Sequence, residues 1–168
     1  MPDLDRVQIR PAGQADADAV TALYVASWNA GFLGFLPEIT ASSARVERWR
    51  MDLAAPPPHR WWVAERDGIL LGFAGIGPAR DSPDTRLGEL DTIAVQPDSW
   101  RRGLGRALMA QSITQLAQDG YRSAILWTLD GYDRVRCFYR VTGWRPDGVT
   151  RASGTQMRWS HPLCPGRP

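Results

Sequence analysis

The stretch Ile93–Met109, IAVQPDSWRRGLGRALM, decides the fold, because it joins an apolar strand to an amphipathic helix through a glycine-rich turn. Gly103 and Gly105 let the backbone turn tightly and approach a ligand without a Cβ in the way. The N–H groups that open the helix have no partners inside it, and the helix dipole adds positive potential there. Three basic residues surround the turn: Arg101, Arg102 and Arg106. The turn is therefore predicted to bind an anionic group such as a pyrophosphate.

Two other phosphate-binding motifs do not fit this turn. It lacks the GK[ST] ending of a Walker A loop, and GLGRAL lacks the third glycine of a dinucleotide-binding fingerprint. The segment is instead similar to the acetyl-CoA motif of the GCN5-related N-acetyltransferases, written [QR]-x-x-G-x-[GA] after a strand that ends in V-x-P. Val95, Gln96 and Pro97 match that ending, whereas Trp100 stands where Gln or Arg is usual.

A second block, Ile125–Trp144, resembles the later signature of the same family. Its sequence, ILWTLDGYDRVRCFYRVTGW, reads as a strand, a short helix containing F-Y and a closing G-W. The matching residues are Phe138, Tyr139, Gly143 and Trp144. The two blocks occur in the family's order and spacing, and the resemblance extends over residues 60–159.

The hydrophobic pattern predicts the elements that this resemblance requires. Strands are expected at 7–10, 61–66, 69–77, 88–95 and 123–129, with two last segments near 144 and 156–160. Helices are expected at 17–28, 42–53, 103–118 and 133–141. The resemblance implies an α/β (α+β) fold: a mixed, mostly antiparallel sheet of about seven strands, flanked by about four helices, with a splay between the fourth and fifth strands. One domain is predicted at 1–162, followed by a short tail at 163–168.

The resemblance implies acetyl-CoA as a cosubstrate and no metal. The pantetheine arm would pair with the strand backbone at Ile93, Ala94 and Val95, and an N–H near Ile93 or Ala94 would stabilise the oxyanion. The remaining cofactor-binding positions are Arg101, Arg102, Gly103, Leu104, Gly105, Arg106, Tyr132 and Arg134. Tyr132 stands where the family often has an Asn that contacts the cofactor.

Acetyl transfer to an amine needs a group that accepts the proton of the amine and an acid for the departing thiolate. The resemblance puts Tyr139 close to the CoA sulfur as the acid; the alternative is a Tyr that only packs on the sheet. Glu89 falls where some family members carry a catalytic glutamate and is the candidate base. The alternative for Glu89 is an ordinary strand carboxylate paired with a cation. Asp91, two residues further, points to the same side of the sheet.

The acceptor site is expected at the loop between the first two helices, which borders the acceptor pocket in this fold. Trp28, Phe32 and Phe35, together with Asp91, are predicted to contact the substrate, a primary amine of a small molecule or peptide. The three aromatic residues would equally suit a cover for the core or a dimer contact.

The composition of the chain limits its expected binding partners and its expected location in the cell. The 168 residues carry a formal net charge of +2, which argues against a nucleic-acid partner, and contain no apolar run that would cross a membrane. The two cysteines form no disulfide framework, so a cytoplasmic location is expected, with Cys137 as a buried apolar residue. Three further readings remain open: a homodimer, use of a longer acyl-CoA, and a non-catalytic CoA-binding sensor domain.

Overall fold

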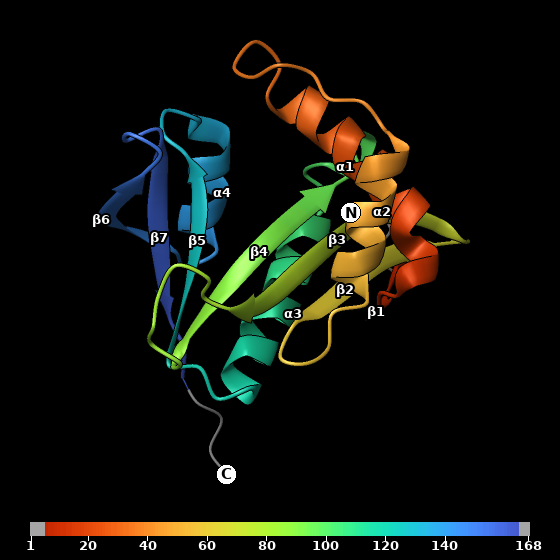
Figure 1. The fold of residues 1–168 in the computed structure, drawn as a ribbon. Helices are drawn as coiled ribbons and strands as arrows, with labels where there is room; N and C mark the ends of the chain where they lie inside the picture. Colours follow the sequence, from red (N-terminus) through yellow and green to blue (C-terminus); the bar gives the residue numbers. More distant parts are fainter. Residues whose placement is uncertain (1–5, 165–168) are drawn as a thin grey trace. The chain divides into compact units, whose positions relative to one another are not determined.

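The computed structural model describes residues 6–164, which form seven strands, four α-helices and two short 3-10 helices (Figure 1). The strands are β1 (Gln8–Pro11), β2 (Arg60–Arg66), β3 (Ile69–Pro78), β4 (Leu87–Val95), β5 (Ser123–Leu129), β6 (Arg145–Arg151) and β7 (Gln156–Pro162). The helices are η1 (Gln14–Asp16), α1 (Ala17–Gly31), α2 (Ser43–Leu53), η2 (Pro97–Ser99), α3 (Leu104–Gln118) and α4 (Asp133–Val141).

The strands are hydrogen-bonded in the order β1-β2-β3-β4-β5-β7-β6. β4 pairs in parallel with β5, over Leu87–Glu89 and Ser123–Ile125. The pairs β1 with β2, β5 with β7 and β6 with β7 are antiparallel. The predicted fold class, a mixed and mostly antiparallel seven-stranded sheet with four helices, is confirmed.

The chain divides into two compact units, each described by itself. Among the described residues, the first unit holds 6–75 and 92–110, and the second holds 76–91 and 111–164. The single domain at 1–162 stays a prediction, and its first five residues lie outside the described range, as do the last four residues of the predicted tail.

In the first unit, alternate residues of each strand face opposite layers, as the two-residue period of a strand requires. One layer joins α1 and α2 to the sheet and contains Ala17, Val20, Leu23, Trp49, Leu53, Trp61, Val63, Phe73 and Ala94. The other joins α3 to the sheet and contains Ala64, Ala74, Val95, Leu104 and Leu108. The segment that leads from β4 into α3 is therefore anchored by apolar residues at both of its ends.

The hairpin between β2 and β3 turns at residues 67 and 68, in the gap between the strands predicted at 61–66 and 69–77. Asp67 and Gly68 both have positive φ, at 51° and 78°, which is the geometry that favours an Asp-Gly pair in a two-residue hairpin. Ser42 begins α2 by accepting a hydrogen bond from the Arg45 N–H at 3.2 Å, as predicted for a helix start.

In the second unit, the hairpin of β6 and β7 and helix α4 surround two tryptophans. Trp144 and Trp159 are fully buried, and the Tyr139 ring of α4 lies 6.0 Å from that of Trp159. The expectation that Cys137 is buried is wrong: it lies on the exposed side of α4, because the buried side of this short helix is taken by Tyr139.

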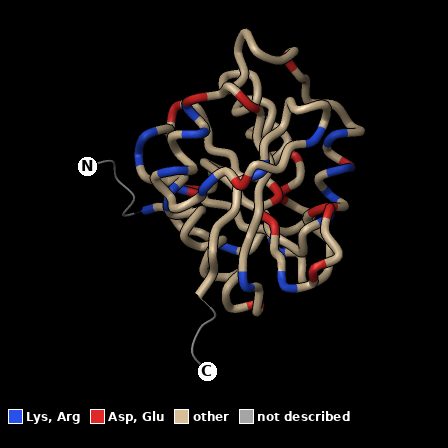
Figure 2. The backbone as a smooth tube through the Cα atoms, turned by 90° about the vertical axis from the view of Figure 1, so that its left-hand side faces the viewer, with Lys and Arg blue, Asp and Glu red and all other residues tan. Residues whose placement is uncertain are grey.

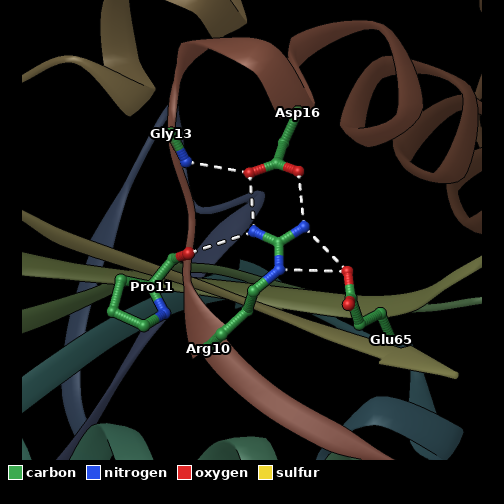
Figure 3. Close-up of polar contacts among 5 residues, drawn as sticks. All are labelled: Arg10, Pro11, Gly13, Asp16 and Glu65. Atoms are coloured by element: carbon green, nitrogen blue, oxygen red, sulfur yellow. Dashed lines mark hydrogen bonds and ion pairs between the residues drawn. The ribbon is translucent and has the colours of Figure 1, made fainter. Parts of the chain in front are cut away.

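Arg10 ties β1 to β2 and to the start of α1 (Figure 3). Its guanidinium donates to both oxygens of Asp16 at 2.8 and 3.0 Å, and to Glu65 at 2.7 and 3.0 Å. Asp16 also accepts from the Gly13 N–H at 2.9 Å. The hydrogen bonds from Arg10 hold the pKa of Asp16 below its usual value, although partial burial acts the other way. Asp16 precedes the first residue of α1, but its side chain binds Arg10 instead of capping that helix.

Arg10→Met is expected to lower the free energy of unfolding by about 1–2 kcal/mol at pH 7, since it breaks a partly buried, multiply hydrogen-bonded ion network. The pKa of Asp16 is depressed by folding, so this contribution is present above the ordinary Asp pKa and is lost as the pH falls below it. Urea unfolding at pH 7 and pH 3 checks both points. Arg48→Met, which removes an exposed ion pair at 3.6 Å, is the control and should cost less than about 0.5 kcal/mol.

Candidate active site

The glycine-rich turn of the first unit has the geometry of an anion-binding loop. After β4, the short helix η2 leads to Arg101 and Gly103, whose φ values are positive at 61° and 85°. α3 then begins at Leu104, and the Gly103 carbonyl accepts the first helical hydrogen bond, from Ala107 at 3.0 Å. The N–H groups of the first helical turn have no intrahelical acceptors, so they can bind phosphate oxygens.

The side chains of the three arginines predicted at this turn are exposed and have no polar partner among the described residues. Within residues 6–164, Arg101, Arg102 and Arg106 form no ion pair and no side-chain hydrogen bond. Other arginines of the chain, such as Arg10 and Arg80, are paired with carboxylates. Three unpaired guanidinium groups beside a helix N-terminus fit a polyanionic ligand.

Trp100, the departure from the family motif, has a structural role. Its indole Nε1–H donates to the Val95 carbonyl at 2.7 Å, and its ring packs against the layer that contains Leu104 and Leu108. The Gln96 N–H donates to the Leu71 carbonyl at 2.8 Å and fixes the same end of β4. Trp100 therefore holds the turn from within, and the backbone cradle does not depend on a Gln or Arg at this position.

The other predicted cofactor residues are divided between the units. Ala94 and Val95 are buried and Ile93 is half-buried at the end of β4, while Gly105 is half-buried in the first turn of α3. In the second unit, Tyr132 is buried before α4 and Arg134 is exposed in its first turn. Their roles toward a cofactor stay predictions.

Glu89, the candidate base, is nearly inaccessible and bound at both oxygens. Its side chain is 4% exposed. Oε2 accepts from the backbone N–H of Arg80 and Oε1 from the guanidinium Nη2 of the same residue, both at 3.0 Å. Arg80 Nη1 also lies 3.2 Å from Asp91 Oδ2. These contacts are consistent with both interpretations of Glu89, as a catalytic base and as a strand carboxylate paired with a cation. Glu89 is paired with Arg80, and Arg80 also contacts Asp91, a second carboxylate that is partly exposed.

Arg80 is the residue of this group that sequence reasoning missed. It lies in the loop between β3 and β4, outside both family blocks. Partial burial opposes its charge, but the attraction of Asp91 and the hydrogen bond to Glu89 outweigh burial and raise the pKa of the guanidinium. The only signal in the sequence is one of two Arg residues in a polar loop, nine residues before Glu89, and it does not indicate which carboxylate it binds.

Tyr139, the candidate acid, is buried but keeps a free hydroxyl. It is 9% exposed, and within residues 6–164 its hydroxyl makes no hydrogen bond. Burial raises the pKa of Tyr139 to about 12. The phenol therefore keeps its proton at neutral pH and has that proton to donate.

Two of the three aromatic residues predicted for the acceptor, Trp28 and Phe32, contact each other at the C-terminal end of α1. Trp28 lies 4.6 Å from Phe32 and 5.9 Å from Tyr24, measured between ring centroids, and its Nε1–H donates to the Pro37 carbonyl at 3.2 Å. Phe35 is 64% exposed. Trp28, Phe32 and Phe35 belong to the first unit and Asp91 to the second, so their shared contact with a substrate stays a prediction.

The distribution of charge and apolar length adds two observations. Basic and acidic residues are interspersed along the backbone (Figure 2). In the described part of the chain, no helix is long and apolar enough to cross a membrane, and no group of three or more His, Cys, Asp or Glu residues is placed to hold a metal ion.

Comparisons with known proteins agree with this geometry. An uncharacterized N-acetyltransferase of Bacillus subtilis, YuaI, is 27% identical over 125 residues, which are 74% of this chain and 72% of that protein. A phosphinothricin N-acetyltransferase of Alcaligenes faecalis is 28% identical over 165 residues, which are 95% of this chain and 81% of the relative.

A solved structure shares the fold. The PaiA N-acetyltransferase of Thermoplasma acidophilum, determined in complex with coenzyme A, superimposes with a TM-score of 0.73 at 14% identity, covering 94% of this chain and 99% of that one. The model of the acetyltransferase (GNAT) family matches residues 18–144, which include the glycine-rich turn, Glu89 and Tyr139. This match spans most of the chain, and the protein is therefore a member of the GNAT family of acetyltransferases.

Proposed function

We propose that the protein transfers the acetyl group of acetyl-CoA to a primary amine of a small molecule or peptide, by direct attack of the amine. The observation that carries this proposal is the segment 101–106, which combines positive φ values, free helix N–H groups and three arginines that form no ion pair with any described residue. These features fit the pyrophosphate and phosphate groups of coenzyme A.

Acetyl-CoA would supply an activated acetyl group as a thioester. The chain's own residues would move the protons: Glu89 accepts one from the amine, directly or through a water molecule, and Tyr139 donates one to the sulfur. The amine nitrogen then forms its bond to the acetyl carbon as the carbon–sulfur bond breaks. The products are an N-acetyl amine and a free thiol.

Two features of the second unit support these roles. Within residues 6–164 the Tyr139 hydroxyl has no hydrogen-bond partner, and it stays protonated at neutral pH, as an acid must. Glu89 uses one acceptor direction on each oxygen toward Arg80, and a carboxylate has about four such directions, so acceptor capacity remains.

Glu89→Gln is expected to lower kcat/KM for the amine about 100-fold, because the amide cannot accept the proton. The dissociation constant for acetyl-CoA should stay unchanged. Thiol release at saturating acetyl-CoA measures the first quantity and calorimetry the second. Glu65→Gln alters a strand carboxylate that is likewise bound to an arginine, and this control should keep the wild-type rate. A wild-type rate in Glu89→Gln would refute the base assignment.

A further inference from the structure

We propose that Arg80 is a positioning residue that holds Glu89 in one orientation, ionised and ready to accept a proton. The inference rests on the proposed function of Glu89 as the base, and it concerns the second unit alone. It assigns a part in the reaction to a loop residue that lies outside both motifs of the family.

The contact between Arg80 and Glu89 restrains the carboxylate at two points. One oxygen accepts from the backbone N–H of Arg80 and the other from its guanidinium, each at 3.0 Å. Two bonds from one residue fix both the position and the plane of the carboxylate group. An isolated surface ion pair would not restrain it in this way.

Burial makes the guanidinium important for the charge of Glu89. The side chain of Glu89 is 4% exposed, so water contributes little to stabilising its ionised form. Its register partner on β5 is Ile125, which is itself buried and apolar. A carboxylate in such surroundings takes up a proton more readily unless a cation lies next to it.

Arg80 also bridges Glu89 to the more accessible carboxylate. Its Nη1 lies 3.2 Å from Asp91 Oδ2, and the Asp91 side chain is 29% exposed. One guanidinium therefore faces two carboxylates, one buried and one open to solvent. Its positive charge offsets the repulsion that two neighbouring like charges would otherwise have.

The loop that carries Arg80 is fastened at each side. The Ala79 N–H donates to the Leu87 carbonyl at 3.0 Å, which closes the base of the loop. Asp81 forms an ion pair with Arg151, whose guanidinium lies 4.1 Å from the ring centroid of Trp127. Arg80 thus interacts with three carboxylates, those of Glu89, Asp91 and Asp81. Within residues 6–164, both hydrogen bonds of the Glu89 carboxylate come from Arg80.

Arg80→Gln tests the inference through the pH dependence of kcat/KM for one amine at saturating acetyl-CoA. Without the cation, the acid limb of the profile should move to higher pH by about one unit, so the rate at a pH on that limb should fall about tenfold, while the rate well above the limb stays close to that of the wild type. Arg80→Lys keeps the charge and should recover part of the shift. Arg86→Gln removes an exposed arginine of the same loop, which binds Asp84, and should leave the profile unchanged. A slower rate without movement of the limb would mean a purely structural role and would overturn the inference.

Carboxyl carbon NMR separates the inference from the proposed function. The sequence contains only four glutamates, Glu38, Glu47, Glu65 and Glu89, so glutamate labelled at the side-chain carboxyl gives few signals, and Glu89→Gln identifies one of them. In Arg80→Gln this signal should titrate at a higher pH than in the wild type. If the signal moves but Glu89→Gln is fully active, the base assignment fails and the positioning contact stands. If the signal does not move, the positioning inference fails, whatever the rates.

The double variant Arg80→Gln/Glu89→Gln covers the case in which Arg80→Gln does not fold, because it also removes the buried charge that would be left unpaired. If Arg80 acts through Glu89, the double variant should be no slower than Glu89→Gln. A further loss of tenfold or more would show that Arg80 acts by another route and would contradict the inference.

Discussion

Replacing Gly103 by Glu is expected to weaken acetyl-CoA binding by about 100-fold or more, a loss of about 2.7 kcal/mol of binding free energy. Gly103 has a φ of 85° immediately before α3, where a side chain would occupy the space of the anionic ligand. A carboxylate at this point would also repel the pyrophosphate and occupy the free N–H groups of the helix. Isothermal titration with acetyl-CoA measures the effect.

The control for this variant is Gly120→Glu. Gly120 lies two residues after the end of the same helix, with a φ of 90°, and no heavy atom outside its chain neighbours lies within 4 Å of a Cβ built there. The two substitutions therefore add the same charge and a similar backbone strain, but only one lies at the proposed cradle. Wild-type acetyl-CoA affinity in Gly103→Glu, or an equal loss in Gly120→Glu, would contradict the placement of the cofactor.

Tyr139→Phe is expected to lower kcat about 100-fold, because it removes the proton for the departing sulfur. The ring keeps its packing at 6.0 Å from Trp159, and the hydroxyl has no partner in the described part of the chain, so the fold and the affinity for acetyl-CoA should be retained. Thiol release and calorimetry on the same preparation separate turnover from binding.

Tyr121→Phe is the matched control for Tyr139→Phe. Tyr121 is also buried, at 6% exposure, and burial together with Asp119 raises the pKa of its phenol as well. Its loss should leave kcat unchanged. Unchanged turnover in Tyr139→Phe would assign the acid role to another group or to water.

Most helices and strands could be predicted from the sequence, because the residue patterns that specify them are local. The strand Ser123–Leu129 and the helix Asp133–Val141 have the predicted bounds, and Asp67-Gly68 forms the predicted turn. β6 was harder to predict, because an edge strand with exposed residues and a bulge between Pro146 and Thr150 lacks the alternating apolar pattern.

The site was predictable to the extent that it follows a motif. The turn at Gly103 could be predicted because a tight turn followed by a helix start requires particular residue types at consecutive positions. The contact of Arg80 with Glu89 has no such sequence pattern, because it depends on a loop that folds back on β4. The burial of Glu89 likewise reflects tertiary packing, which a single strand carboxylate does not reveal.

The most direct test of the central claim is isothermal titration of the purified protein with acetyl-CoA, followed by thiol release with a panel of primary amines. We expect one binding site per chain and thiol release with at least one amine. Binding without turnover on a broad panel would favour the non-catalytic sensor. If acetyl-CoA does not bind, the cofactor assignment is wrong, and the roles in acetyl transfer proposed for Glu89, Tyr139 and Arg80 are wrong as well.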